Sequence, residues 1–138
     1  MTRTFKGRVI KSTGSWYSVM DDAGKTINCR LKGLYRTKGI RATNPIAVGD
    51  IVDYSISDTD NSGLIINIHA RKNYLIRKAT KLSKATQIIA ANIDQVVVIV
   101  SLTKPRTSTG FIDRILTTSE AYHIPAIIIF NKFDLYDK

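Results

Sequence analysis

An apolar run near the carboxyl end of the chain constrains its fold more than any other stretch. Residues 126–130 read Ala-Ile-Ile-Ile-Phe, and Asn-Lys-Phe-Asp follows at residues 131–134. Five consecutive apolar residues predict a strand that is buried on both faces, as in a parallel sheet covered by helices. Open α/β sheets bind their ligands at the carboxyl ends of such strands. Residues 131–134 are therefore a candidate binding site.

The polar residues of this site, Asn131, Lys132 and Asp134, have the side chains that guanine recognition requires. A carboxylate at Asp134 can accept two parallel hydrogen bonds, from the ring N–H and the exocyclic amine that guanine has and adenine lacks. The stem of Lys132 can lie against the base, and the Asn131 amide can bridge the base and nearby backbone. A base without both donors is rejected, because the carboxylate would stay unpaired. The alternative is an ordinary polar exit from a strand.

The residues before this site complete a βαβ pattern. Residues 95–102 predict a second strand buried on both faces, and residues 110–123 predict an amphipathic helix. Pro125 ends the helix because it cannot continue one. We expect two parallel strands joined by a right-handed crossover.

The amino-terminal part of the chain predicts a small barrel. Five short strand-like runs occur, with one long connection between the third and the fourth, at residues 5–11, 16–20, 25–31, 51–56 and 64–70. This spacing favours a five-stranded Greek-key barrel of the OB type, with a small SH3-like barrel as the alternative. We expect Trp16 and Tyr17 to belong to the barrel core or surface rather than to serve as dedicated stacking platforms.

The net charge of +10 lies entirely in the first part of the chain. Residues 1–88 hold 16 Lys and Arg against 6 Asp and Glu, whereas residues 89–138 hold 5 of each sign. This distribution predicts a polyanionic partner for the amino-terminal part and a domain boundary near residues 71–90. We expect an RNA-binding barrel over residues 1–70, a basic connector over 71–90, and the start of an α/β domain over 91–138.

The basic segment between the third and fourth runs is the candidate RNA contact. Cations can follow a phosphate backbone while an aromatic ring stacks a base. The candidates in this segment and at the start of the connector are Lys32, Tyr35, Arg36, Lys38, Arg41, Arg71 and Lys72. The alternative is a solvated loop whose charges keep the domain soluble.

Cysteine and histidine content excludes several other classes of site. Cys29 is the only cysteine, so the chain has no internal disulfide and no cysteine-cluster zinc site, and we expect a buried thiol. Neither His69 nor His123 has a partner at metal spacing, so both are expected to be structural. No apolar run is long enough to span a bilayer, and the first residues lack a secretory signal. We therefore expect a cytoplasmic protein.

The order of these segments resembles the RsgA (YjeQ) family of circularly permuted GTPases that depend on the small ribosomal subunit. The resemblance covers essentially the whole chain and rests on the barrel, the basic connector and three runs: Ala-Asn-Ile-Asp-Gln-Val-Val-Val-Ile-Val at 91–100, Phe-Ile-Asp-Arg-Ile-Leu at 111–116, and Ile-Ile-Ile-Phe-Asn-Lys-Phe-Asp-Leu at 127–135. It implies that the βαβ unit opens a P-loop GTPase-like domain and that Asn131, Lys132 and Asp134 bind the base of GTP or GDP. It also implies maturation of the small ribosomal subunit, with the barrel helping to bind ribosomal RNA.

The chain departs from the family in what it lacks. It contains no Gly-x-x-x-x-Gly-Lys-Ser/Thr, and the α/β part at residues 91–138 contains no Asp-x-x-Gly, so it lacks the phosphate cradle and the Mg²⁺ ligands. We expect an amino-terminal portion of a longer GTPase that is inactive alone, with Mg²⁺ and a structural Zn²⁺ bound only in the missing part.

Two strands and one helix also make a poor core, which favours self-association. The alternative function is a non-enzymatic RNA-binding OB module of translation or ribosome assembly.

Overall fold

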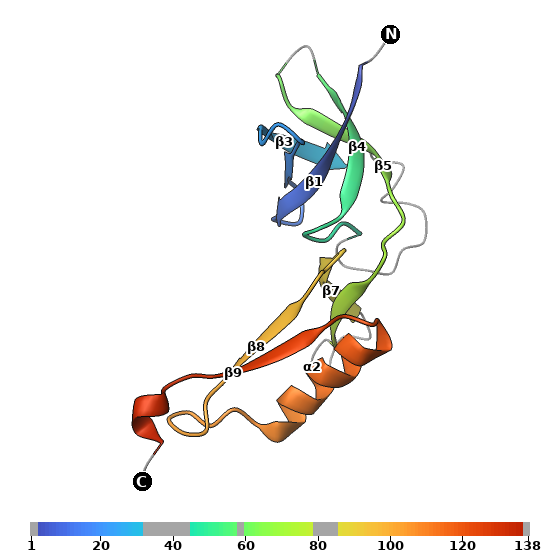
Figure 1. Ribbon diagram of the computed structural model, residues 1–138. Coiled ribbons are helices and arrows are strands. Elements are labelled where there is room, and N and C mark those ends of the chain that lie inside the picture. Colours follow the sequence, from blue (N-terminus) through green and yellow to red (C-terminus); the bar gives the residue numbers. More distant parts are fainter. Residues whose placement is uncertain (1–2, 32–44, 58–59, 79–85, 137–138) are drawn as a thin grey trace. The chain divides into compact units, whose positions relative to one another are not determined.

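The chain divides into two compact units, Met1–Asn92 and Ile93–Lys138, here named the barrel unit and the βαβ unit (Figure 1). The computed structural model describes residues 3–31, 45–57, 60–78 and 86–136. None of the helices within these residues is both long enough and apolar enough to cross a membrane.

Five strands of the barrel unit close into a barrel in the order β1-β2-β3-β5-β4 (Figure 1). The strands are β1 Thr4–Ser12, β2 Tyr17–Met20, β3 Thr26–Leu31, β4 Ile51–Ile56 and β5 Gly63–Ile68. β3 and β5 run parallel, and the other neighbours are antiparallel. The predicted OB-type barrel is confirmed, with each strand within two residues of its expected limits.

The barrel core is made by inward-facing residues that alternate with exposed ones, as in any half-buried strand. Its buried members are Val9, Tyr17, Val19, Cys29, Ile46, Val52, Tyr54 and Ile65. Cys29 is fully buried as predicted, and burial raises the pKa of its thiol to about 12. Gly63 faces it across the β3–β5 pair, where a Cβ would lie 2.2 Å from the Cys29 sulfur. A side chain at Gly63 would therefore displace the core.

A buried ion pair joins the chain before β4 to the chain after β5. Asp50 is completely buried, and its carboxylate accepts hydrogen bonds from Arg71 Nε at 2.6 Å and Arg71 Nη2 at 2.7 Å. The Ala47 amide donates to the same carboxylate at 2.8 Å, and Arg71 Nη2 also donates to the Pro45 carbonyl at 3.0 Å. The bond to Asp50 raises the pKa of Arg71. The planar guanidinium thus fixes both segments in one geometry.

The stretch predicted to be a basic connector contains two strands. β6 (Tyr74–Lys78) and β7 (Thr86–Ala91) pair antiparallel, and a β-bridge joins Val48 to Ala90. Asn92 donates to the Gly49 carbonyl at 2.9 Å, where the chain turns with a positive φ. The charge of this stretch suggested a linker, but each of the two runs also contains apolar residues, and the two runs pair with each other as strands. Both strands belong to the barrel unit.

The βαβ unit has the predicted order of elements. β8 (Val96–Val100) and β9 (Ala126–Phe130) pair parallel, and α2 (Thr109–Ala121) connects them. The Ser108 hydroxyl accepts from the Phe111 amide and caps the start of α2. Ile112 and Ile115 of α2 pack against the buried side of β8. A short 3₁₀ helix, η1 (Phe133–Leu135), follows β9.

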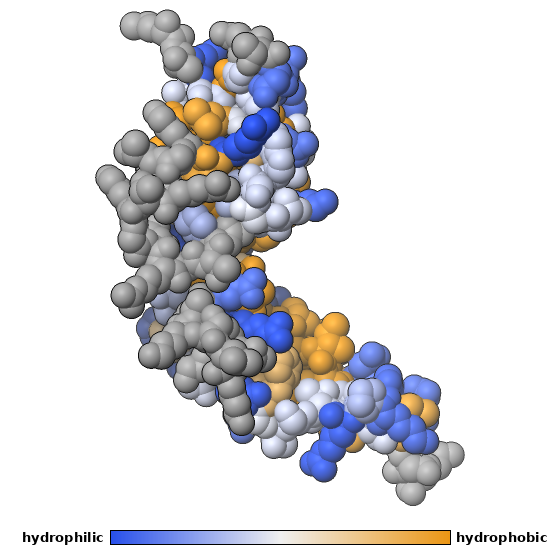
Figure 2. All heavy atoms as spheres, turned by 180° about the vertical axis from the view of Figure 1, so that it is seen from behind, coloured by the Kyte–Doolittle hydropathy of each residue, from blue (hydrophilic) through white to orange (hydrophobic). Residues whose placement is uncertain are grey.

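The prediction that both strands are buried on both faces is wrong for the structure described. β8 alternates between buried and exposed residues, and every residue of β9 is exposed. The face of the sheet away from α2 displays four apolar side chains, Val97, Ile99, Ile127 and Ile129, at 46–63% exposure (Figure 2). An apolar run indicates that a strand can be buried, but burial needs a covering layer on each face. Within the described residues, α2 covers one face only.

Loss of the buried arginine should destabilise the barrel unit strongly. We expect Arg71→Ala to lower the free energy of unfolding by roughly 2–4 kcal/mol, because the Asp50 carboxylate would stay buried without its counter-charge. Urea unfolding followed by Trp16 fluorescence measures this change. Arg77→Ala, which removes an exposed arginine from β6, is the matched control and should change it by less than about 0.5 kcal/mol. Equal effects of the two variants would contradict the role of the ion pair.

Candidate functional site

The polar residues predicted to bind guanine begin where the pairing of β8 and β9 ends. β9 stops at Phe130, and the Asn131 amide still donates to the Val100 carbonyl at 2.8 Å. Asn131 is thus the last residue held by the sheet, just beyond the carboxyl end of β9. This is the position that open α/β sheets use for ligand binding.

A tight turn carries the remaining residues of the motif. Lys132 adopts the left-handed conformation, with φ 59° and ψ 42°, and η1 follows immediately. The Leu135 amide donates to the Lys132 carbonyl at 2.9 Å and so closes the turn around Asp134. A non-glycine residue in the left-handed region costs on the order of 1 kcal/mol, and such strain is found at functional sites. The turn predicted to recognise guanine, residues 131–136, is therefore a defined structure rather than a loose strand exit, and it is called the guanine-recognition turn after that prediction.

The Lys132 ammonium group joins this turn to the loop that follows β8. Its Nζ donates a hydrogen bond to the Lys104 carbonyl. That loop is held by its own bonds, since the Ser101 amide donates to the Thr107 hydroxyl at 2.9 Å and the Thr107 amide to the Ser101 carbonyl at 2.8 Å. The methylene stem of Lys132 therefore stretches between two segments that leave the same edge of the sheet.

Tyr136 makes a second link between the same segments. Its hydroxyl donates to the Asn131 carbonyl and accepts a hydrogen bond from the Leu102 amide at 3.2 Å. Its ring packs edge-on against Phe133, with 5.8 Å between ring centroids. Sequence reasoning missed this residue because the motif spacing stops at Asp134. The sequence offered one signal for this role, which is that a tyrosine stands two residues after Asp134.

The structure thus brings the three predicted guanine-binding residues together on one turn. Asn131 and Asp134 are exposed, and Lys132 is half-buried because of its bond to the Lys104 carbonyl. An exposed amide and an exposed carboxylate at a fixed turn can pair with the edge of a planar base.

The predicted RNA-binding residues are distributed differently. Five of them lie outside the described residues: Lys32, Tyr35, Arg36, Lys38 and Arg41. Lys72 is exposed, and its backbone amide donates to the Asn92 side chain at 2.9 Å. Arg71 directs its guanidinium to the buried Asp50, which is a structural role that its sequence context did not indicate.

No metal site is formed by the residues that the structure describes. Nowhere in residues 3–31, 45–57, 60–78 and 86–136 do three His, Cys, Asp or Glu side chains gather as possible ligands. His69 instead bonds Asp53 at 2.9 Å, and this bond and one from Asn67 lower the pKa of Asp53. His69 and Asp53 thus form a pair rather than part of a cluster of three such ligands.

Comparison with known families matches both units of the chain. The model of the RsgA N-terminal domain matches residues 6–65, and that of the RsgA GTPase matches residues 68–138. The small ribosomal subunit biogenesis GTPase RsgA of Flavobacterium johnsoniae is 57% identical over 130 residues, which is 93% of this chain and 40% of that protein. The protein of the same name from Phocaeicola vulgatus is 54% identical over 133 residues, or 96% and 43% of the two chains.

Solved structures agree with this match. The crystal structure of YjeQ from Thermotoga maritima superimposes with a TM-score of 0.68 at 34% identity, covering 99% of this chain and 44% of that one. YloQ, described as a circularly permuted GTPase, has a TM-score of 0.67 at 34% identity over 99% and 43%. The chain spans less than half the length of these relatives. The family resemblance seen in the sequence is confirmed, and this chain belongs to the RsgA family of circularly permuted GTPases.

Proposed function

We propose that this chain carries the RNA-binding barrel and the guanine-recognition turn of a small ribosomal subunit biogenesis GTPase. The observation that carries the proposal is the placement of Asn131, Lys132 and Asp134 on one fixed turn at the carboxyl edge of parallel strands. The names of the relatives, small ribosomal subunit biogenesis GTPases, support it.

Guanine recognition follows from the chemistry of the turn. The Asp134 carboxylate accepts hydrogen bonds from the ring N–H and the exocyclic amine of the base. The stem of Lys132, drawn across to the Lys104 carbonyl, offers methylene groups to the base face. The Asn131 amide bridges the base and the backbone. The ligand is therefore GTP or GDP rather than an adenine nucleotide.

Hydrolysis belongs to the complete protein. Phosphoryl transfer needs a backbone cradle for the phosphates and a Mg²⁺ ion that neutralises their charge. The 138 residues contain no Gly-x-x-x-x-Gly-Lys-Ser/Thr motif, so we propose that this chain alone is inactive and that Mg²⁺ and a structural Zn²⁺ bind outside it. Specific GTP turnover by the purified 138-residue chain would contradict this.

The barrel is the proposed RNA-binding part. All of the net positive charge lies in residues 1–88, and barrels of this type bind oligonucleotides. The proposed partner is the ribosomal RNA of the small subunit, and the proposed location is the cytoplasm, where that subunit matures. A non-enzymatic RNA-binding module would share this charge, but it would not need the guanine-recognition turn.

An exchange of one functional group at Asp134 tests the base assignment. In the complete protein, we expect Asp134→Asn to weaken guanine nucleotide binding by roughly a hundredfold or more and to improve xanthine nucleotide binding. The amide can donate to the 2-carbonyl that xanthine has in place of the amine. Titration with labelled GDP and XDP measures both affinities. Asp113→Asn, on the exposed side of α2, is the matched control. Unchanged preference in Asp134→Asn would overturn the assignment.

Removal of the Tyr136 hydroxyl tests whether the turn must be held in place. We expect Tyr136→Phe to weaken GDP binding by the complete protein roughly three- to tenfold, because the bonds to the Asn131 carbonyl and the Leu102 amide are lost. Guanine-over-xanthine preference should persist, since Asp134 is intact. Tyr74→Phe removes a hydroxyl from β6 and serves as the control. If both variants bind GDP like the wild type, Tyr136 does not position the turn.

The exposed face of the β8–β9 sheet supports a further proposal about the isolated chain. Val97 lies beside Ile127, and Ile99 beside Ile129, so the four side chains form one contiguous apolar surface. Such a surface favours burial against another molecule. In the 138-residue chain we propose a second copy as the partner.

Self-association is expected to depend on this surface. Size-exclusion chromatography with light scattering should show dimers or larger species that increase with concentration. The double variant Ile99→Thr, Ile129→Thr should shift the chain toward the monomer, because threonine keeps strand propensity but reduces the apolar area. Ile10→Thr changes an exposed isoleucine of β1 and should leave association unchanged. A wild-type chain that stays monomeric at high concentration would contradict this.

A further inference from the structure

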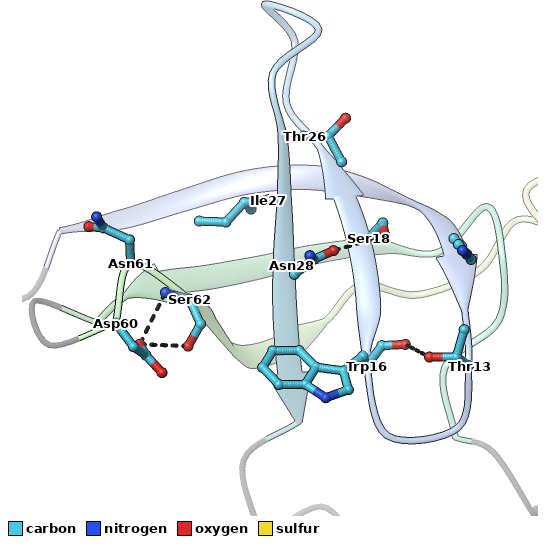
Figure 3. A pocket seen from close by; sticks show the side chains of 10 residues that line it. Thr13, Trp16, Ser18, Thr26, Ile27, Asn28, Asp60, Asn61 and Ser62 are labelled. Atoms are coloured by element: carbon cyan, nitrogen blue, oxygen red, sulfur yellow. Dashed lines mark hydrogen bonds between the residues drawn. The ribbon is translucent and has the colours of Figure 1, made fainter.

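A hollow on the outer surface of the barrel has features that the functions above do not use. It is lined by residues of β1, β2 and β3, of the β1–β2 turn and of the turn before β5, and its volume of about 650 Å³ falls in the range of small-ligand sites (Figure 3). Six of its lining residues are named here the Trp16 surface: Lys11, Trp16, Ser18, Asn28, Asp60 and Ser62.

Strand register places three polar side chains of this surface in one row. Lys11 of β1 lies opposite Ser18 of β2, which lies opposite Asn28 of β3. Their chain neighbours Tyr17 and Cys29 point into the core, so the row points outward. The Ser18 hydroxyl donates to the Asn28 amide oxygen at 3.1 Å and orients that amide (Figure 3). The row offers a cation for a phosphate and amide donors for a base edge.

Trp16 lies beside the row, two residues before Ser18, and its backbone is held in place (Figure 3). The Thr13 amide and hydroxyl both donate to the Trp16 carbonyl, at 3.0 and 3.1 Å, and hold the turn. The indole keeps 38% of its surface exposed, whereas the next residue, Tyr17, is buried. An exposed indole on a turn whose backbone is held is a surface on which a planar base can stack.

Arg30 completes the arrangement around the indole. Its guanidinium carbon lies 4.2 Å from the centroid of the Trp16 ring, and its Nη2 lies 3.7 Å from the Asp60 carboxylate. Asp60 is itself held by Ser62, whose amide and hydroxyl donate to it at 3.1 and 2.8 Å. Asp60 is thus bonded within the protein and aligns the cation over the ring. A cation on an indole also adds to the attraction for nucleic acid.

The ordinary interpretation, which is also the one expected from the sequence, is that Trp16 belongs to the barrel surface and that Arg30 merely covers it. Two observations favour a binding site. The Trp16 surface combines the β2–β3 face, the β1–β2 turn and the β4–β5 turn, which are the parts that OB-type barrels use for oligonucleotides. It also belongs to the part of the chain that holds the entire positive excess.

We propose that the Trp16 surface binds an unstacked base of single-stranded RNA, with the base stacked on the indole of Trp16. The Asn28 amide and the Ser18 hydroxyl contact the base edge, and Lys11 contacts an adjacent phosphate. This inference rests on the proposed RNA binding by the barrel and names a contact site for it. Stacking on the indole is tolerant of base identity, so any unpaired base can occupy the site, and the base-edge contacts of Asn28 and Ser18 set only which base is preferred.

The single tryptophan of the chain makes the proposal directly measurable, because Trp16 is the only source of indole emission. We expect short single-stranded oligoadenylate to quench this emission in a saturable way. An abasic oligonucleotide of the same length should bind through its phosphates without comparable quenching. Both titrations use the full 138-residue chain at several salt concentrations.

Substitution of the indole separates stacking from charge. By fluorescence anisotropy of labelled oligoadenylate, Trp16→Ala should weaken binding roughly five- to hundredfold, and Trp16→Phe should weaken it less because a ring remains. The dependence on salt should persist in both variants, since the phosphate contacts are intact. Ile89→Ala, an exposed isoleucine of β7, is the matched control and should bind like the wild type. Circular dichroism checks that each variant is folded.

The contrary outcomes are distinct. Saturable binding without quenching, together with unchanged affinity in Trp16→Ala, would overturn the Trp16 surface while leaving RNA binding by the barrel intact. Equal quenching by the abasic oligonucleotide would overturn base stacking. If the wild-type chain binds neither oligonucleotide, both the stacking site and the proposed RNA binding fail.

Discussion

The buried pair of Asp50 and Arg71 is the interaction on which the barrel unit most depends. A carboxylate removed from water is tolerated only when charge and hydrogen bonds compensate it, and Arg71 and the Ala47 amide provide both. The pair fixes the approach to β4, and the neighbouring Gly49 receives the Asn92 side chain beyond β7. The barrel and the β6–β7 pair are therefore joined near Gly49 and Asp50. Arg71, which the sequence predicted to bind RNA, instead stabilises the fold.

The turn proposed to recognise guanine is also held by contacts between separate segments, here at the edge of a sheet. The motif residues come from one short segment, yet their placement depends on a second segment, the loop after β8. Lys132 and Tyr136 each join the two by a hydrogen bond to backbone. A turn supported in this way can present Asn131 and Asp134 to a ligand in a single arrangement, which lowers the ordering cost of binding.

Most strands and the motif at residues 131–134 were predictable from the sequence, because they depend on residues that are close together in the chain. Alternation of apolar residues located the barrel strands, and the run at 126–130 with its polar exit located both β9 and the motif. The errors share a physical cause. The connector was judged by its charge, although Leu75 and Ile88 belong to two strands that pair with each other. The strands β8 and β9 were judged buried on both faces, although α2 is the only element of the described residues that covers them. Pairing partners and covering layers are not local properties.

The sequence by itself determined the order of the elements, the family, the location of the positive charge and the three candidate guanine-binding residues. These depend on residue type and spacing along the chain. Only the tertiary structure decided that Arg71 is bound to a buried carboxylate, that Tyr136 supports the turn, and that Trp16 lies exposed beside Arg30 at a hollow. Each of these joins residues that the chain separates, and a contact across strands or loops exists only after the barrel and the sheet have closed.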